Sequence, residues 1–322
     1  MRNTSVKITS AVVLAVAACS LLSASCSKDT TGTARRPIVL NATVGGATKA
    51  PVITADTFHD YTIWLSAYLN DTANRENTGD YFTGEPFHYT PDGWKAGEEK
   101  FWPFSGTMGF LAISADADLL DIESVSSWGE ERNTDGVLIR VPEGKGNDTE
   151  ILYARSTMSS HANAVGLNFY HTQMLLRFSF TTHAADIMRL DAVTLRGVLP
   201  YGDLLIRSDA FLTAEWDLTQ TPYQDCSVPG IDGDDLSTEP ISFDIVLPAQ
   251  RIGDIKVDFH MKASASDPWE TALPKTFTFT ADDIEWVTGK VYTFNTSITA
   301  TDLTVAPVVE DWITVDRPGE TI

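Results

Sequence analysis

Apolar and polar residues alternate over short stretches along most of the chain, and this pattern constrains the fold more than any other feature. In residues 167–181, LNFYHTQMLLRFSFT, the alternation runs through Leu176, Phe178 and Phe180. Successive side chains of a strand point to opposite faces, so a period of two indicates strands with one buried face. No stretch keeps a long 3.6-residue period. The pattern therefore favours an all-β sandwich architecture over a helical or α/β fold.

Such segments occur on both sides of a small, polar run at residues 156–164. We interpret this run as a domain junction, with one β-sandwich domain over residues 50–163 and a second over residues 164–322. Turn residues mark a hairpin in residues 87–95, FHYTPDGWK, and residues 101–114 predict a strand pair or one bent strand. Further strands are expected at residues 61–69, 137–141, 150–154, 190–199, 204–207, 241–247, 255–263, 276–280, 291–299, 303–305 and 308–315.

The first 25 residues have the composition of a secretory signal. Arg2 and Lys7 precede an apolar run at residues 11–22, which is too short and wrongly flanked for a membrane span. Small residues follow and end at Cys26. Cys26 is a better candidate for the acylated cysteine of a bacterial lipoprotein than Cys19, which lies inside the apolar run and lacks small residues before it.

The rest of the chain has one cysteine and a strongly acidic balance. Only Cys226 remains after Cys26, so we expect no intrachain disulfide and no cysteine-rich metal site. From Ser27 onward there are 21 Lys and Arg (23 less Arg2 and Lys7) against 44 Asp and Glu, a formal charge of −23. A surface of this charge repels nucleic acid and anionic lipid, so neither is an expected partner.

The sequence contains none of the common catalytic motifs. G-x-S-x-G, H-E-x-x-H, G-x-G-x-x-G and the P-loop are all absent. The histidines are spread without ligand-like spacing, at positions 59, 88, 161, 171, 183 and 260. Residues 232–235, DGDD, invite a calcium interpretation, but position twelve of an EF-hand loop would be Phe243, so we interpret them as a solvated acidic loop. We predict no enzymatic activity, no cofactor and no metal site.

Tryptophans raise the alternative of a glycan-binding surface, because aromatic faces stack on sugar rings. Trp64, Trp102 and Trp286 occur in strand-like contexts, where core packing is the ordinary explanation. Trp94 and Trp269 are flanked by turn residues and are the better candidates for surface positions. One hypothesis is therefore a monomeric surface lipoprotein that binds glycans through exposed aromatic side chains.

Residues 37–50, PIVLNATVGGATKA, read as one strand followed by a flexible hinge. The apolar face of this strand comprises Ile38, Leu40, Ala42 and Val44. Gly45 and Gly46 separate the strand from Lys49, after which a trypsin-like protease would cut before Ala50. Two interpretations remain open: an ordinary first strand and loop, or a strand that proteolysis removes.

Several blocks occur in an order found in one known family. Residues 22–26, LSASC, are lipobox-like, and they are followed by the strand RPIVLNATVGG, the block FWPFSGTMGFLAIS and the block EILYA. The C-terminal run EWVTGKVYTFNTSITATDLTVAPVVEDW is the most specific block. In this order, over the whole chain, the blocks resemble the fimbrillin family of Bacteroidetes.

The resemblance implies two transthyretin-like β-sandwich domains in a fimbrial subunit. It implies export to the outer membrane as a lipoprotein acylated on Cys26, trimming by a trypsin-like protease after Lys49, and polymerisation with other subunits by strand exchange. The first strand, residues 38–44, would then leave with the cut peptide. Arg35 and Arg36 offer an alternative cut that would keep this strand, so an uncut tip, anchor or accessory protein stays open as an alternative.

The resemblance also places a donor strand at the C-terminus. We expect two short strands there, separated by Pro307, which lie outside both cores and fill the vacated groove of another subunit. The donor residues are Leu303, Val305, Val309, Trp312, Ile313 and Val315. Beyond fellow subunits and the protease, a host or bacterial surface receptor is the expected partner in adhesion.

Overall fold

The computed structural model gives an all-β chain, as predicted from the alternating pattern. It describes residues 35–44, 53, 57–71, 79–115, 137–143, 150–159, 164–183, 188–206, 214–251, 255–262, 273–279, 286–299 and 303–312. The chain divides into the compact units Met1–Arg35 and Arg36–Ile322, and the strands below all belong to the second unit. The described residues include no helix long and apolar enough to cross a membrane.

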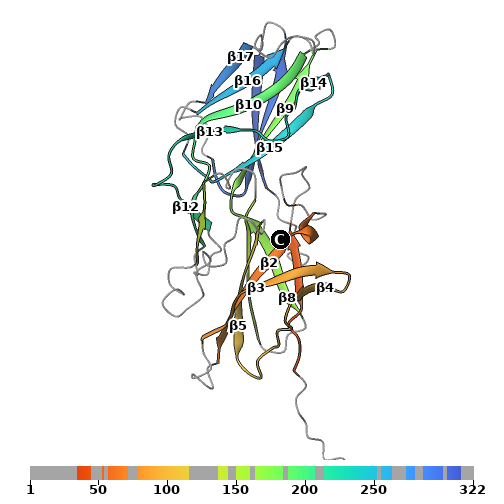
Figure 1. Cartoon of the computed structure of the whole chain (residues 1–322), viewed down its shortest axis with the longest axis vertical. Coiled ribbons are helices and arrows are strands. Elements are labelled where there is room, and N and C mark those ends of the chain that lie inside the picture. The colour runs from red at the N-terminus through yellow and green to blue at the C-terminus, as the bar shows by residue number, and fades with distance from the viewer. Residues whose placement is uncertain are drawn as a thin grey trace, which may run out of the picture. The chain divides into compact units, whose positions relative to one another are not determined.

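A closed β-barrel contains the N-terminal strands (Figure 1). Its strands are β1 (Leu40–Val44), β2 (Thr62–Asn70), β3 (Gly79–Thr90), β4 (Gly93–Ala96), β5 (Thr107–Ala115), β7 (Leu152–Ser159) and β8 (Val165–His171). The order around the barrel is β1-β4-β3-β2-β5-β7-β8, and a parallel pairing of β8 with β1 closes it. The expected hairpin is the β3–β4 pair, in which Thr90 stands opposite Gly93. Gly93 has φ of 100°, a conformation that favours glycine and allows the tight turn.

A second, smaller sheet covers the outside of the barrel at β5. It consists of β6 (Val137–Val141), β11 (Gly202–Ile206) and β12 (Ala214–Asp217), in the order β12-β11-β6. Leu111 and Ile113 of β5 join a core with Ile139 and Leu204 of this sheet, while Phe110 of β5 points into the barrel core. Strand β5 is therefore buried on both faces, which explains its nearly continuous apolar sequence.

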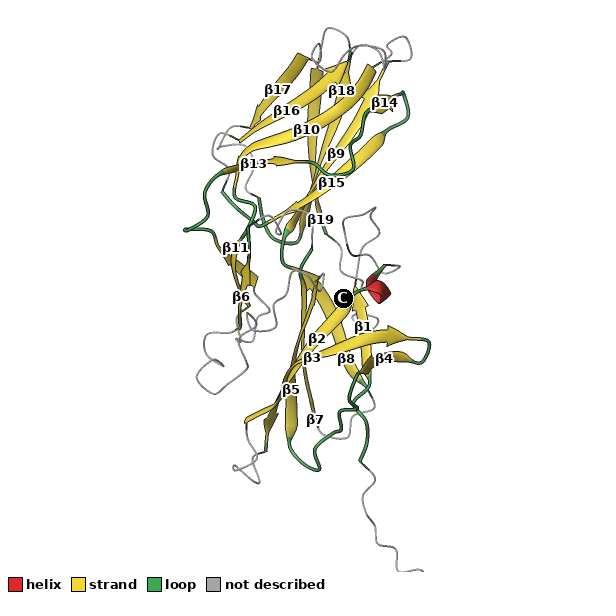
Figure 2. Ribbon diagram, viewed as in Figure 1, coloured by secondary structure: helices red, strands yellow, loops and turns green. Residues whose placement is uncertain are grey.

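The remaining strands form a two-layered sandwich (Figures 1 and 2). One sheet has the order β15-β9-β18-β19, and in the other β13-β10-β16-β17 is joined by β14, which pairs with β10. Their bounds are β9 (Met174–Thr182), β10 (Met188–Val198), β13 (Gln224–Ser227), β14 (Asp234–Leu236), β15 (Ile241–Leu247), β16 (Ile255–Lys262), β17 (Leu273–Phe279), β18 (Lys290–Ile298) and β19 (Leu303–Asp311).

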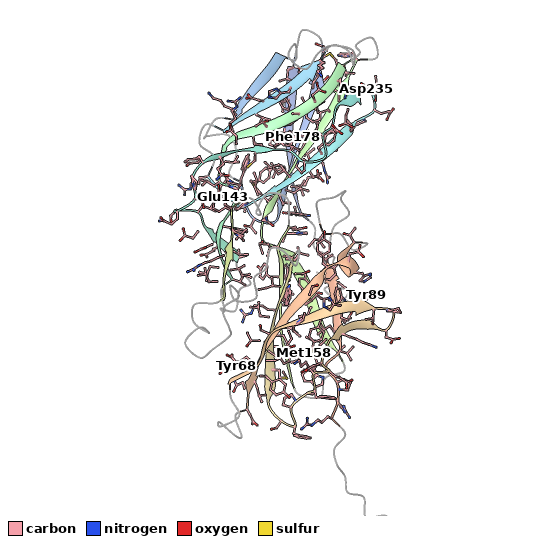
Figure 3. The ribbon with its side chains drawn as sticks, viewed as in Figure 1. Tyr68, Tyr89, Glu143, Met158, Phe178 and Asp235 are labelled. Atoms are coloured by element: carbon pink, nitrogen blue, oxygen red, sulfur yellow. The ribbon has the colours of Figure 1, made fainter. Side chains whose placement is uncertain are left out.

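Aromatic side chains from both sheets fill the sandwich core. Phe178 of β9, labelled in Figure 3, meets Phe259 of β16 edge to face, with ring centroids 6.4 Å apart. Phe178 also stacks on Phe294 of β18, at 5.2 Å. The alternating face predicted in residues 167–181 is thus the buried face of β9, because Leu176, Phe178 and Phe180 all lie in this core.

Three local features differ from the sequence-based expectations. The N-terminal strands form a closed barrel, where a β-sandwich was expected. Strand β8 belongs to this barrel, although it follows the domain boundary expected between residues 163 and 164. Within the expected junction at residues 156–164, residues 156–159 continue β7. The C-terminal residues 303–311 form one strand that runs through Pro307, where two short strands were expected.

Candidate functional site: the first and last strands

Strand β1 lies between β8 and β4 and completes the barrel (Figure 2). It pairs with β8 in parallel over its whole length, from Leu40 opposite Val165 to Val44 opposite Phe169. Against β4, one register pair joins the two strands, Leu40 opposite Trp94. The seam on the β8 side is therefore long, and the seam on the β4 side is short.

The apolar face of β1 points into the barrel core. Ile38, Leu40 and Val44 are buried there, and Ala42 packs against the same core. The other face is polar and exposed, and Thr43 donates a hydrogen bond from Oγ1 to Asn168 Oδ1 of β8 at 3.1 Å. Val39, with 41% of its surface exposed, lies outside the apolar face.

The residues just before β1 are held by backbone hydrogen bonds. The amide of Ile38 donates to the carbonyl of Lys100 at 2.7 Å, and the amide of Trp102 donates to the carbonyl of Arg36 at 2.8 Å. Pro37 forms an antiparallel bridge with Phe101. The peptide bond between Arg36 and Pro37 is therefore part of a hydrogen-bonded pairing, although both side chains are exposed.

Aromatic side chains line the part of the barrel that β1 covers. Phe58, in the short 3-10 helix η1 (Phe58–Asp60), lies 5.2 Å from Trp94 and 5.0 Å from Phe169 between ring centroids. Trp94 is only 4% exposed, so the expectation that it lies on the surface is wrong. The turn residues around Trp94 suggested exposure, but β1 and η1 cover its ring. Trp269 lies outside the described residues.

The exposed aromatic residue at this place is Tyr89, labelled in Figure 3. Its ring stacks on His59 at 3.6 Å between centroids and meets Trp94 edge to face at 5.4 Å. Trp102 and Trp286 are buried, as expected for strand-like contexts, and Trp64 packs against the core under the outer sheet.

Strand β19 is the edge of its sheet among the described strands. It pairs along its whole length with β18, with Leu303 opposite Ile298 and Asp311 opposite Lys290. Pro307 fits at an edge because it has no amide to donate to a further strand. Lys290 and Asp311 form an ion pair. Val309 is 50% exposed, so β19 carries an apolar side chain on its open surface.

A charged pair lies two strands from β19, on the other side of β18. Arg177 of β9 donates two hydrogen bonds to Asp244 of β15, at 2.8 and 2.9 Å. The bonds to Asp244 raise the pKa of Arg177 most, and Glu310 of β19 adds a favourable charge interaction.

The C-terminal strand is not free of the cores, which corrects the expectation that it lies outside them. Leu303 and Val305 pack against the sandwich core. Trp312, directly after β19, is 5% exposed and joins a small core with Leu175 and Val291. Its amide donates to the carbonyl of Gly289 at 2.8 Å. Before β19 could join another subunit, it would have to leave these contacts.

Several predicted site residues fall outside the described part of the chain. They are Cys26, Lys49, Ala50, Ile313 and Val315. Arg35 and Arg36 are described, with exposed side chains. The structure brings the apolar residues of β1 into the barrel core, and it places Leu303, Val305, Val309 and Trp312 on the sandwich and at its edge.

The acidic loop and His88 have local partners. Asp234 Oδ2 accepts a hydrogen bond from the amide of Asp232 at 3.2 Å. Thr62 and His88 lie within hydrogen-bonding distance, at 3.2 Å. Within the described ranges, no three His, Cys, Asp or Glu side chains converge as a metal-binding group.

Two further residues of interest carry no sequence motif. Glu150 and His171 are buried and hydrogen-bonded to each other, and the ring of His171 stacks on Trp312. They stand 21 residues apart and come together because β7 and β8 are neighbours in the barrel. The block EILYA begins at Glu150, but nothing in it distinguishes this carboxylate from a surface residue.

Comparison with known proteins gives a family and a set of related folds. A family model described as fimbrillin-like matches residues 48–312. A candidate cell adhesion protein from Bacteroides uniformis has a similar structure, with 15% identity, a TM-score of 0.55 and coverage of 86% of this chain and 99% of that chain. A candidate cell adhesion protein from Bacteroides ovatus is similar with 14% identity, a TM-score of 0.50 and coverage of 88% and 100%. A comparison with curated proteins gives no match.

The likeness to these solved structures shows the fold, and the family match shows the relationship. The matched family is one of fimbrial structural proteins and not of enzymes. Since the match covers residues 48–312 of a 322-residue chain, the protein belongs to the fimbrillin-like family.

Proposed function

We propose that the protein is a structural subunit of a cell-surface fimbria and that it assembles when another subunit's strand replaces β1. Membership of the fimbrillin-like family supports a fimbrial role at the cell surface. The position of β1 supports the proposal that another subunit's strand replaces it. Strand β1 closes the barrel through a parallel pairing with β8 and one register pair with β4.

Loss of β1 would convert a closed barrel into an open one. A closed barrel has no edge strands, and an open edge recruits foreign strands through its unpaired backbone groups. Removal of β1 would leave edges on β8 and β4 and uncover Trp94 and Phe169 between them. Strand addition to such an edge is a known mode of protein recognition.

The energetics favour refilling the groove. Each restored ladder hydrogen bond contributes roughly 0.5–1.5 kcal/mol net. Burial of a Leu, Ile or Val side chain contributes roughly 1.5–3 kcal/mol. Three such side chains are buried here: Ile38, just before β1, and Leu40 and Val44 of β1. A donor with a similar face would recover these terms without any nucleotide.

Processing supplies the trigger in this proposal. Cys26 carries the lipid that holds the precursor at the outer membrane, and a cut after Lys49 removes the lipid together with β1. The family match begins at residue 48, one residue before Lys49, and this supports a boundary at the proposed cut. A cut at Arg36 is disfavoured by the pairing of residues 36–38 with residues 100–102, since susceptibility depends on the hydrogen bonding of the affected backbone.

The donor in this proposal is the C-terminal segment of another subunit, identical or related. Strand β19 is an edge strand with exposed Val308 and Val309, and its pairing with β18 must open for donation. The residues proposed to fill the groove are Val309, Ile313 and Val315, with Leu303, Val305 and Trp312 released from the sandwich. A trypsin-like protease and a surface receptor are the further proposed partners.

Limited trypsin digestion of the precursor tests the proposal. We expect a folded product that begins at Ala50 and forms a ladder of oligomers on a gel run without boiling, while uncut precursor stays monomeric. A product that begins at Pro37, keeps β1 and remains monomeric would instead indicate a tip, anchor or accessory subunit. A first cut deep inside a barrel or sandwich strand would contradict the proposed hinge.

A further inference from the structure

Glu150 joins two segments that lie far apart in the sequence. Its Oε2 accepts a hydrogen bond from the amide of Ile53 at 2.7 Å, and its Oε1 accepts one from Nδ1 of His171. Glu150 and Ile53 are buried, with Ile53 only 1% exposed. Both oxygens of one buried carboxylate are therefore occupied by groups from different parts of the chain.

His171 extends this connection to the C-terminus. Its ring lies parallel to the indole of Trp312, with centroids 3.7 Å apart and an angle of 8° between the planes. The backbone on both sides of the stack is also tied, because the amide of Trp312 donates to Gly289 and the amide of Gly289 donates to the carbonyl of Gln173 at 2.9 Å. Contacts thus run without interruption from Ile53 to the end of β19.

Ile53 is four residues beyond Lys49, and Trp312 directly follows β19. We propose that Ile53, Glu150, His171 and Trp312, here named the Glu150 bridge, couple the docking of the segment after the proposed cut to the docking of the C-terminal strand. The regulatory meaning of the bridge rests on the proposed function: a cut after Lys49 would loosen Ile53, and this would favour release of β19 as a donor.

The physical reason for coupling is the shared carboxylate. If the amide of Ile53 leaves, one oxygen of a buried carboxylate loses its donor, which raises the free energy of the docked arrangement of Glu150 and His171. His171 is the platform for Trp312, so a displaced His171 weakens the stack. Coupling between two sites is reciprocal, and release of Trp312 must then loosen Ile53 by the same factor.

Amide hydrogen exchange in the intact precursor, followed by NMR, tests the coupling. Glu150→Leu removes both acceptors, and we expect exchange of the Trp312 amide to accelerate about tenfold, within the usual range of coupling between sites. Glu150→Gln is the matched control, because its amide oxygen accepts from Ile53 and its NH2 group donates to the other tautomer of His171. In Glu150→Gln we expect the Trp312 amide to exchange at nearly the same rate as in the unchanged chain.

The reciprocal arm uses Trp312→Ala, which lies outside the barrel core and so leaves a foldable chain even if Glu150→Leu fails to fold. We expect the amide of Ile53 to exchange about tenfold faster, whereas Asp258→Asn, at a buried acid of β16, leaves both amides unchanged. An unchanged Ile53 amide in Trp312→Ala, or acceleration of equal size in Asp258→Asn, would overturn the proposal. Neither result depends on polymerisation, so a failure of the bridge and a failure of the proposed function are distinguishable.

Discussion

Leu40 of β1 stands opposite Trp94 of β4, and this is the one register pair between these two fully described strands. On its other side, β1 pairs with β8 at five successive positions, Leu40, Asn41, Ala42, Thr43 and Val44. The barrel therefore closes through one strand that is held mainly from one side. Strand β1 thus contributes to the barrel core, and among the described strands its removal would break pairings only with β8 and β4.

Truncation of the Leu40 side chain, at the seam between β1 and β4, should destabilise the full-length chain. Leu40→Ala removes buried apolar atoms beside Trp94, and we expect the free energy of unfolding to fall by about 2–5 kcal/mol. Val39→Ala, at an exposed position of the same segment, should change it by less than about 0.5 kcal/mol. Urea unfolding of the two variants measures the difference. Equal effects would show that β1 does not contribute to the barrel core.

The C-terminal strand offers a second matched pair. Trp312→Ala should lower the free energy of unfolding of the sandwich by about 3 kcal/mol, because it empties a buried position and removes the stack on His171. Val309→Ala, at a half-exposed position of β19, should have an effect of less than about 0.5 kcal/mol. Thermal unfolding followed by circular dichroism provides the comparison. A larger loss in Val309→Ala than in Trp312→Ala would contradict the described attachment of β19.

The buried thiol of Cys226 should react slowly. Burial raises the pKa of Cys226 to about 11, and the charge of Asp225 adds to the shift, so little thiolate forms at pH 8. We expect alkylation by iodoacetamide to be slow in the folded protein and fast in urea. Rapid reaction of the folded protein at pH 8 would contradict the described burial.

The same shift predicts a direction for stability against pH. The folded pKa of Cys226 lies above the unfolded value of about 9, so the unfolded chain loses its thiol proton first as the pH rises. The contribution of the buried, protonated thiol to the free energy of unfolding is fully present below pH 9 and is lost as the pH approaches 11. In Cys226→Ala, the decline of stability over this range should be shallower than in the unchanged chain, as measured by urea unfolding at several pH values.

The proposed donor face gives a prediction about assembly. Ile313→Asp in the trimmed protein would bring an unpaired charge into the apolar groove, at a cost of several kcal/mol, so ladders should be lost while the monomer remains folded. Thr314→Asp, one residue further along and on the opposite face of an extended strand, is the matched control and should retain assembly. Ladders that persist in Ile313→Asp would exclude this residue from the interface.

The sequence predicted the buried faces better than the partners of each strand. Phe178 and Phe180 lie in the core, as their alternation indicated, because side-chain period is a local property. The parallel pairing of Val44 with Phe169 joins distant residues, and no local pattern specifies it. Pro307 suggested a break between two strands, but an edge position tolerates a residue without an amide, so β19 continues through it.

The sequence predicted the burial of the β1 residues correctly but not that of Trp312. The apolar face of β1 was evident from its alternation, whereas Trp312 was expected to lie outside the cores and is buried against Leu175 and Val291. The difference arises from His171, whose ring stacks on Trp312, and from Glu150, which is hydrogen-bonded to His171, and neither residue carries a motif. Burial of a single tryptophan after an edge strand depends on such tertiary contacts.

A peptide with the sequence of residues 36–46 tests the central claim most directly. Added in excess to protein trimmed at Ala50, it should occupy the groove between β8 and β4, bind with one-to-one stoichiometry and prevent ladder formation, as measured by native mass spectrometry and unboiled gels. A control peptide with Leu40→Asp and Val44→Asp should neither bind nor inhibit. Ladders that grow equally in the presence of bound peptide would contradict the account, because the groove left by β1 would then not be the acceptor.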